Sequence, residues 1–291
     1  MRKNPGPIYA FPVGVWISSF FIVPISIIFL YSFMQKGLYG GVVFKFCLDA
    51  YRALSNSTFL SVSVTTFYIA LFSSVIMVSL AIPAAYFIAR SSRKNFYLLL
   101  VIIPFWTNFL IRIYAWIAIL GNNGFLNNFL ISTGLIDNHI QFLYNKYAVI
   151  LVTVYTYLPF AILPLYSSVE KFDFSLLEAA RDLGATKIQS IMKIMLPNIR
   201  GGITTAVLFT FIPSFGSYAI PQILGGPDSL MLGNIIAREL TVTRNWPLAA
   251  SISVVLTVIT TIGVVLFMKL NAAAAESVKI PANIDKQAVE A

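Results

Sequence analysis

Charged side chains are scarce in this sequence. Only 11% of its 291 residues are Asp, Glu, Lys or Arg, whereas 58% are hydrophobic. Soluble globular domains carry about 25% charged residues, so this composition indicates an integral membrane protein. The net charge of +9 does not indicate nucleic-acid binding, because the basic residues are spread between apolar segments and form no single stripe.

Cysteine and histidine each occur once. A single Cys47 excludes a disulfide within the chain and a cysteine metal cluster. His139 lies in a polar, loop-like stretch, and the chain has no second histidine with which it could build a metal site. We therefore expect no metal site, and the sequence assigns neither residue a role.

Several motifs of enzymes and carriers are also missing. The sequence has no Gly-rich Lys-Ser/Thr loop for nucleotide phosphates, no His-Glu-x-x-His, no dinucleotide fingerprint and no nucleophile elbow. None of its 11 acidic residues falls inside an expected membrane span, although ion-coupled carriers usually keep ionisable groups there. We therefore expect a transport protein that is not itself an enzyme, holds no cofactor and receives its energy from another protein.

Long stretches without charge predict an all-α integral membrane protein with six transmembrane helices, since a bilayer core needs about 20 apolar residues. The expected spans are 9–33, 62–89, 96–118, 147–168, 202–223 and 247–268. The first charge-free run is too long for a cleavable signal core of roughly 7–15 residues. Lys and Arg gather on the side of both termini, which predicts that both termini are cytoplasmic. We expect one transmembrane domain over 1–271 and a disordered cytoplasmic tail over 272–291.

The loop between the fourth and fifth spans, at about 170–200, has the sequence pattern of two short helices. Ser175 with Glu178, and Thr186 with Gln189, each have the form of a capping box. Gly184 falls where the first helix needs a residue of positive φ.

The second helix of this loop is expected to end at Pro197. Ile188, Ile191, Met192 and Met195 repeat at helical spacing and predict one apolar face. The small residues between the two helices would let the turn enter a groove of another protein. A helical hairpin packed only on its own domain is the alternative.

One motif in this loop resembles a known family. The sequence Glu178-Ala-Ala-Arg-Asp-Leu-Gly184, followed by Ile-Met-Leu-Pro at 194–197, resembles the EAA loop of ABC-importer permeases. Residues 104–114, 163–171 and 244–247 are similar to the spermidine/putrescine (PotB-type) permeases of that family. The resemblance covers nearly the whole chain and implies the type I importer (MetI-like) permease fold.

The resemblance also implies partners in a bacterial inner membrane. These are a homologous second permease subunit, two ATPase subunits that hold ATP and Mg, and an extracytoplasmic polyamine-binding protein. By motif match, the residues implied to couple to the ATPase are Glu178, Ala179, Ala180, Asp182 and Gly184. A permease for thiamine, ferric iron, sulfate or an opine is the first alternative, and an ATP-independent channel or carrier is the second.

A polyamine pathway needs carboxylates, dipoles or aromatic faces, because aromatic rings attract cations. The candidate pathway residues are Trp106, Asn108, Tyr114, Trp116, Tyr155, Ser214, Tyr218 and Asp228. The residues from 213 to 218, with Pro221, predict a break in the fifth helix that faces a cavity.

The charges near the pathway raise a further question. Arg112 would repel a polyamine, so we expect it near the outer end of the third helix, extending toward the membrane surface or paired with the second permease. The carboxylates that neutralise the substrate are expected from that partner or from external acids such as Asp228 and Glu239.

Overall fold

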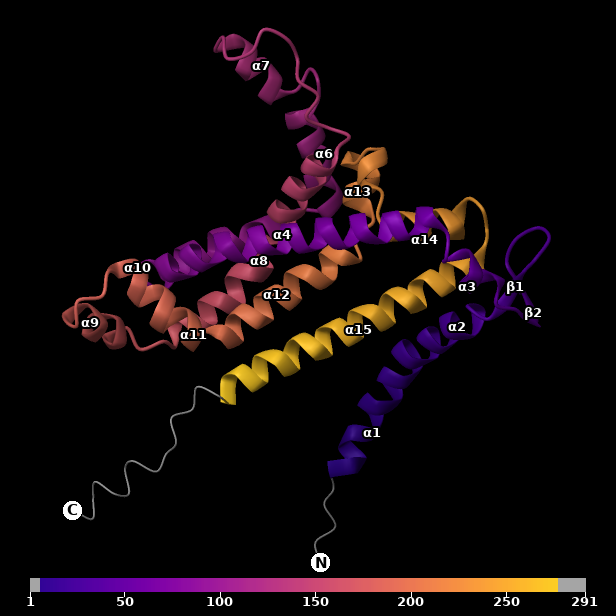
Figure 1. The fold of residues 1–291 in the computed structure, drawn as a ribbon, viewed down its shortest axis with the longest axis horizontal. Coiled ribbons are helices and arrows are strands. Elements are labelled where there is room, and N and C mark those ends of the chain that lie inside the picture. The colour runs from indigo at the N-terminus through magenta and orange to yellow at the C-terminus, as the bar shows by residue number, and fades with distance from the viewer. Residues whose placement is uncertain (1–5, 277–291) are drawn as a thin grey trace, which may run out of the picture. The chain divides into compact units, whose positions relative to one another are not determined.

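A computed structural model describes residues 6–276 of the chain, which are mainly helical (Figure 1). Their contacts divide the chain into two units. Among the described residues, the first unit holds 6–66 with Leu230–Ile259, and the second holds Phe67–Ser229 with 260–276. Helices α4 (Ser57–Arg90) and α15 (Trp246–Glu276) each run from one unit into the other.

The first unit begins with an apolar helix that nothing else in the described chain covers. It consists of α1 (Gly6–Ile17), a π-helical segment (Ser18–Ile22) and α2 (Val23–Tyr31), and its side chains from 11 to 30 are all exposed. Strand β1 (Met34–Lys36) then pairs antiparallel with β2 (Val42–Phe46), and the short helix α3 (Asp49–Ala53) follows.

The core of the first unit lies between α4, α14 (Leu232–Thr241) and α15. It is formed by the buried side chains of Val62, Leu232, Ile235 and Ile252. The buried Thr66 hydroxyl accepts a hydrogen bond from the Leu232 amide at 3.0 Å. Because that amide lies in the first turn of α14, the bond satisfies a donor that the helix itself cannot.

The second unit is built around α8 (Lys146–Glu170), whose side chains are mostly buried. Helix α12 (Arg200–Phe215) packs along α8 and comes close to it at Gly202, where an added Cβ would lie 2.6 Å from the Cβ of Ser168. The Ser74 and Thr210 hydroxyls, which are 2.7 Å apart, join α4 to α12. Close packing by small residues and hydroxyl pairs is typical of helices associated within a membrane.

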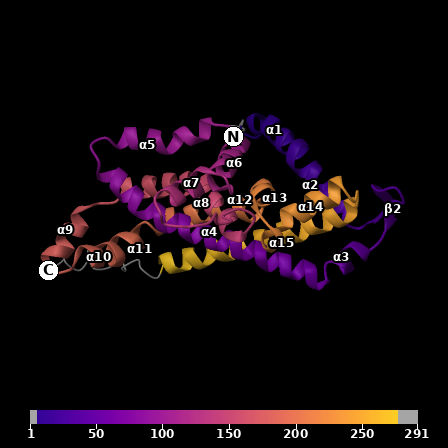
Figure 2. The same ribbon diagram turned by 90° about the horizontal axis from the view of Figure 1, so that it is seen from above.

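The other elements of the second unit are shorter. They are α5 (Lys94–Ile102), a 3₁₀ turn η2 (Ile103–Trp106), α6 (Phe109–Leu120), α7 (Phe125–Ser132), α9 (Ser175–Asp182), α10 (Lys187–Ser190), a π-helical segment (Ile191–Met195), α11 (Leu196–Asn198), α13 (Ala219–Leu224) and a 3₁₀ turn η4 (Pro227–Ser229). Helices α9 to α11 form a hairpin that projects beyond the ends of α8 and α12 (Figure 1; Figure 2).

Five helices of the described chain are long and apolar enough to cross a membrane, and a sixth is added if a bent pair, 187–198 with α12, counts as one span. The predicted all-α membrane fold is therefore confirmed. The expected spans at 62–89, 147–168 and 247–268 each lie inside one continuous helix, α4, α8 and α15.

The third expected span, 96–118, is wrong as a continuous helix. Helical structure stops at Trp106, Thr107 is extended (φ −85°, ψ 144°), and α6 begins at Phe109. The Asn108 side chain accepts a hydrogen bond from the Leu110 amide at 2.8 Å and so caps the new helix. Pro104 and this cap explain the break, since proline cannot donate to a helix and asparagine stabilises a helix start.

The predicted break in the fifth span is confirmed, but the prolines do not form it. Pro213 lies inside α12 and Pro221 inside α13, while the chain leaves the helical conformation between them, at 216–218. At the carboxyl end of the chain, α15 continues to Glu276, past the expected boundary at Asn271. Residues 277–291 of the expected tail lie outside the described residues.

Candidate functional site

The hairpin of α9 to α11 contains the EAA sequence, and its first helix starts differently from the prediction. Ser175 lies inside α9, and the preceding Phe174 provides no side-chain cap. Instead, the Asp173 carboxylate accepts a hydrogen bond from the Ser175 amide at 3.0 Å. The predicted Ser175–Glu178 capping box is therefore wrong, because a carboxylate two residues upstream reaches the free amide first. Hydrogen bonds from the side chain and amide of Ser175 hold the pKa of Asp173 below its usual value.

The second half of the hairpin follows the prediction closely. Thr186 caps α10, with the Gln189 amide donating to its hydroxyl at 3.3 Å and its own amide donating to the Gln189 side chain at 3.0 Å. Gly184 has φ +89°, and the Ala185 amide donates to the Ala180 carbonyl at 3.0 Å. This bond is typical of a helix end closed by a left-handed glycine. The last helix ends at Asn198, one residue beyond Pro197, and the chain then bends by 75° into α12.

The predicted apolar face of the second helix is partly buried and partly exposed. Met195 is completely buried, but Ile188 and Met192, one turn apart, are 69% and 62% exposed. Leu183, at the turn before α10, is 90% exposed. We call Leu183, Ile188 and Met192 the hairpin cap. The hairpin already has its own buried core, and these three apolar side chains lie outside it. Such exposed apolar side chains indicate a surface that another protein covers.

The five residues implied to couple to an ATPase also differ in exposure. Glu178, Ala179, Asp182 and Gly184 are exposed beside the hairpin cap. Ala180 is buried with Leu177 in the interior of the hairpin. The arrangement therefore presents one small side chain, two carboxylates and a left-handed glycine to a partner, while Ala180 lets α9 pack closely.

Polar contacts that the sequence did not reveal join α4, α5 and α8 of the second unit beside the base of the hairpin. The Lys94 ammonium lies 2.7 Å from the Glu170 carboxylate, and the Tyr166 hydroxyl donates to the same oxygen at 2.6 Å. The Arg90 guanidinium lies 5.3 Å from the centre of the Phe174 ring. We call this set of contacts the joint. The sequence features that could have predicted it were the basic turn at 90–94 and the acidic end of α8.

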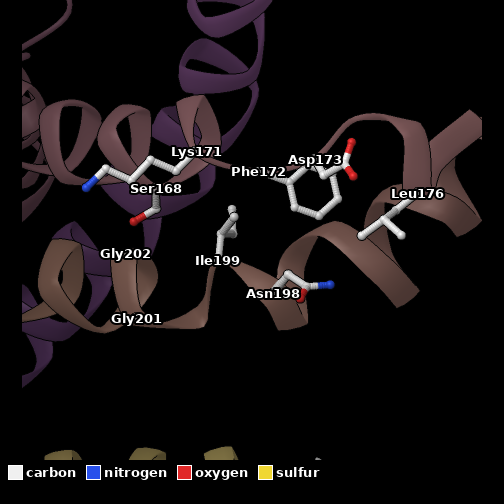
Figure 3. Close-up of a pocket in the computed structure, with 9 residues that line it drawn as sticks. All are labelled: Ser168, Lys171, Phe172, Asp173, Leu176, Asn198, Ile199, Gly201 and Gly202. Carbon is white, nitrogen blue, oxygen red and sulfur yellow. The ribbon is translucent and has the colours of Figure 1, made fainter. Parts of the chain in front are cut away.

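A pocket of about 450 Å³ opens at the same joint (Figure 3). Its lining residues are Ser168, Lys171, Phe172, Asp173, Leu176, Asn198, Ile199, Gly201 and Gly202. In Figure 3, Ile199 lies between the end of the hairpin and the start of α12. The hairpin is therefore joined to α12 through a short bend beside open space rather than through a filled interface.

The candidate pathway residues do not form one cluster. Trp116 and Tyr155 pack edge to face with ring centres 5.4 Å apart. Ser214 is buried and donates to the Thr210 carbonyl at 2.6 Å, and Asn108 serves as the cap of α6. The exposed members are Trp106, Asn108, Tyr114, Tyr155, Tyr218 and Asp228. Only the Trp116–Tyr155 pair is therefore brought together.

The two external acids have different surroundings. Glu239, in the first unit, is buried, and its carboxylate accepts hydrogen bonds from Arg238 at 3.1 Å and Thr243 at 2.5 Å. Asp228, in the second unit, is exposed and accepts the Lys146 amide at 3.3 Å. The Glu239 carboxylate is thus engaged by residues of α14 and the turn after it, which leaves Asp228 as the more available carboxylate.

The Lys146 ammonium marks a feature that the sequence did not predict. It lies 5.9 Å from the centre of the Tyr68 ring and 5.6 Å from that of Tyr147, and its backbone is held by Asp228. Two aromatic rings near the ammonium are surroundings that favour a primary ammonium group. The second unit therefore already accommodates one alkylammonium at this point.

A family model connects this geometry to known proteins. The family described as "Binding-protein-dependent transport system inner membrane component" matches residues 8–277. The chain belongs to this family. The predicted resemblance to ABC permeases is confirmed, and the chain is a multi-pass membrane component of such a transport system.

Individual relatives support the same assignment. The permease is 37% identical over 246 residues to the spermidine/putrescine transport system permease protein PotB of Escherichia coli K12, covering 84% of this chain and 90% of that one. It is 34% identical over 258 residues to PotB of Haemophilus influenzae, covering 88% and 90%. It is also 30% identical to the E. coli inner membrane ABC transporter permease protein YdcU, covering 70% and 69%.

Solved structures share the fold of the permease. A chain of a bacterial ABC transporter involved in the import of the acidic polysaccharide alginate matches with a TM-score of 0.75 at 18% identity, covering 92% of this chain and 96% of that one. A chain of the MetNI methionine ABC transporter matches with a TM-score of 0.55 at 17% identity, covering 74% and 95%. The predicted MetI-like permease fold is therefore confirmed.

Proposed function

We propose that this permease imports spermidine and putrescine into the cytoplasm as one subunit of an ATP-driven complex. The complex contains a homologous second permease, two ATPase subunits that hold ATP and Mg, and an extracytoplasmic polyamine-binding protein. Both termini and the hairpin face the cytoplasm. The relatives that are 34–37% identical over most of the chain, all named as spermidine/putrescine permeases, support the choice of substrate.

The exposed hairpin cap is the observation that carries the coupling proposal. Fully burying a Leu, Ile or Met side chain contributes roughly 1.5–3 kcal/mol, so the three cap residues offer a substantial gain to a protein that covers them. We propose that the cap enters a groove of the ATPase with Ala179 and Gly184 at its closest approach. Glu178 and Asp182 then lie at the rim, where they can select a basic partner surface.

The joint at the base of the hairpin supports a route for movement. A displacement of α9 acts on α4 through Phe174 and Arg90. It acts on α8 through the short connection 171–174, and the Lys94–Glu170 pair joins that end of α8 to α5. The open pocket beside Ile199 leaves the hairpin room to tilt relative to α12. ATP-driven closure of the partner would thereby reach the membrane helices.

For the substrate, the surroundings of Lys146 support binding of an ammonium group. We propose that this region faces the outside and call it the outer mouth. Tyr68, Tyr147 and Asp228 are the residues we assign to it. We keep Trp106, Asn108, Tyr114, Trp116, Tyr155, Ser214 and Tyr218 as proposed pathway residues. Trp116 and Tyr155 have the strongest support, because their paired rings offer aromatic faces on facing helices.

The test is ATP-driven uptake of labelled spermidine into vesicles that contain the whole complex. We expect uptake to require ATP and to be lost in Glu178→Ala and Gly184→Val. Gly134→Val is the matched control, since Gly134 also has positive φ (+70°) and open space around it but lies outside the hairpin. ATP hydrolysis without spermidine uptake would refute the substrate assignment, and uptake that proceeds equally without ATP would refute the coupling proposal.

A further inference from the structure

Residues 34–46 of the first unit form a β-ribbon that follows α2 and consists of β1, a turn and β2 (Figure 1). Its large apolar side chains are exposed. Leu38 and Tyr39, in the turn, are 100% and 97% exposed. Phe44 and Phe46, in β2, are 80% and 70% exposed. Large apolar side chains gathered on an open surface mark a site that a protein or a membrane covers.

The turn of the β-ribbon is held in place by the residues that precede α15. The Gly41 amide donates to the Arg244 carbonyl at 2.9 Å. Gly40 has φ +94°, and a Cβ added there would lie 2.5 Å from the Cβ of Arg244. Only glycine permits so close an approach in this conformation. Leu38 and Tyr39, directly before these glycines, are therefore displayed at a fixed point beside the start of α15.

The β-ribbon begins where two apolar spans end. The candidate span Phe11–Tyr31 has 21 residues, which rise about 31 Å in a helix, and a hydrocarbon core is about 30 Å thick. The span Trp246–Asn271 starts at the same level, because the ring centres of Tyr31 and Trp246 are 6.4 Å apart. Tyr and Trp are enriched at the membrane–water interface. Strand β1 starts three residues after Tyr31, so the β-ribbon begins in the headgroup region.

The apolar surface of the first span continues onto the β-ribbon from ring to ring. Phe33 lies 5.2 Å from the Phe29 ring of α2 and stacks on Phe46 at 6.0 Å. The Phe44 ring lies 6.5 Å from that of Tyr31. The exposed side chains of this span lie on all sides of the helix, so one partner helix cannot cover them all and lipid must meet the rest. The aromatic face of the β-ribbon therefore extends a surface that meets lipid.

The charges of the β-ribbon also fit a lipid surface. Successive residues of a strand point to opposite faces, so Lys45 points away from the face that Phe44 and Phe46 share. Lys36, the last residue of β1, supplies a second ammonium group. Aromatic side chains on one face with lysines beside them are typical of segments that lie in the membrane interface. The rings enter the acyl boundary there, and the ammonium groups reach the lipid phosphates.

We infer that the β-ribbon binds the phospholipid surface at this end of the spans. Its four exposed apolar side chains lie in the acyl boundary, and its two lysines contact the phosphates. Because the strands follow α2 and the turn is tied to the residues before α15, this contact holds both helices at a fixed depth in the membrane. The inference does not depend on the transported solute, and it assigns the β-ribbon to lipid and not to a protein partner.

Photo-crosslinking in the whole complex tests what covers the β-ribbon. In cells that make all subunits, p-benzoylphenylalanine replaces one exposed residue at a time: Tyr39, Phe44, Lys45 or Leu183. After irradiation the complex is purified, and mass spectrometry of its peptides identifies what each position has bound. We expect phospholipid adducts at positions 39 and 44 to be at least fivefold more frequent than at 45 and 183. Position 45 is the matched control on the opposite face of the same strand, and 183 is an open apolar position in the hairpin cap.

Three results would overturn the inference. Adducts with the binding protein or the second permease at both 39 and 44 would show that a protein covers the β-ribbon. No adduct at either position would leave both in water. Equal phospholipid adducts at 44 and 45 would show that the β-ribbon has no lipid face.

A second measurement tests the contribution of the turn. The double variant Leu38→Asp, Tyr39→Asp should lower the phospholipid adducts at position 44 at least threefold, because it places two carboxylates where the acyl boundary is expected. The conservative pair Leu38→Ile, Tyr39→Phe should leave them unchanged. Unchanged adducts in the Asp variant would overturn the anchoring role of the turn.

Discussion

The left-handed conformation of Gly184 allows the coupling proposal to be tested with one substitution. The residue has φ +89°, and a Cβ built on it would meet nothing within 4 Å. Replacing it with valine therefore causes no clash inside this chain, and the cost is conformational. An L-residue in the left-handed region costs roughly 1–2 kcal/mol, and a β-branched residue is expected at the upper end of that range.

This cost falls on the closure of α9 and not on the membrane helices. A loss of 1–2 kcal/mol lowers the closed population relative to open forms about 5- to 30-fold. The Ala185–Ala180 bond and the orientation of the hairpin cap depend on that closure. We therefore expect Gly184→Val to reduce spermidine uptake per ATP hydrolysed by about tenfold, while the amount of permease in the membrane stays the same.

The assay compares uptake and ATP hydrolysis in vesicles for four proteins: wild type, Gly184→Val, Gly184→Asn and Gly134→Val. Asparagine tolerates the left-handed region better than other residues with a Cβ, so Gly184→Asn should keep most of the coupling. Gly134→Val carries a similar backbone strain outside the hairpin and should couple normally. Wild-type coupling in Gly184→Val would refute the reasoning. Equal loss in Gly184→Asn and Gly184→Val would show that contact with the ATPase, and not backbone strain, decides the effect.

Four further predictions concern the hairpin, its joint and the outer mouth. Thr186→Ala removes the cap of α10 and should destabilise that helix by about 1 kcal/mol, seen as faster hydrogen exchange over 187–198, whereas Thr186→Ser should restore protection. Because the pKa of Asp173 is lowered, its carboxylate stabilises α9 fully above the ordinary aspartate pKa, and this stabilisation is lost as the pH falls through the lowered value. Hydrogen exchange of the α9 amides should therefore become faster over that pH range, and Asp173→Asn should abolish this pH dependence. Lys94→Met breaks a half-exposed ion pair with Glu170, so it should change stability little yet lower uptake per ATP, and Lys94→Arg should rescue the ratio. Lys146→Gln removes the lysine ammonium from beside Tyr68 and Tyr147 and leaves that place to the substrate, so it should lower the KM for spermidine several-fold. An unchanged KM would remove this site from the proposed pathway.

The sequence predicted best where a local rule had no competitor. Residues at most a few positions apart determine the Thr186–Gln189 capping box and the left-handed conformation of Gly184. The long helices likewise follow from the local apolar sequence. The box at Ser175 failed because Asp173 offered a stronger acceptor at a neighbouring position. Local patterns of this kind give the candidate start of a helix, but competition among nearby acceptors decides the first residue.

The candidate pathway was harder to predict, because apolar composition does not reveal direction. Tyr155 and Trp116 face each other, whereas Ser214 points into α12 and bonds to its own helix. The ammonium surroundings of Lys146 combine residues from α4, the start of α8 and the loop after α13. No spacing rule connects positions so far apart, and only the folded arrangement brings them together.

The broken third span links the two ends of the proposed mechanism. Uniformly apolar sequence hides the break at 107–108, and hydropathy alone treats 96–118 as one helix. In the structure, α5 starts at Lys94, which is paired with Glu170 beside the hairpin, and the η2 turn ends just before the helix that carries Arg112. A movement at the end of α8, where the hairpin is attached, therefore acts through this ion pair on one end of α5, and the segment that α5 begins ends at the break before α6. The Thr107 amide donates to the Pro104 carbonyl at 3.3 Å and the Asn108 side chain caps α6, so the break keeps a hydrogen bond on each side. We therefore expect part of any movement of α5 to reach α6, where Trp116 packs against Tyr155 of α8.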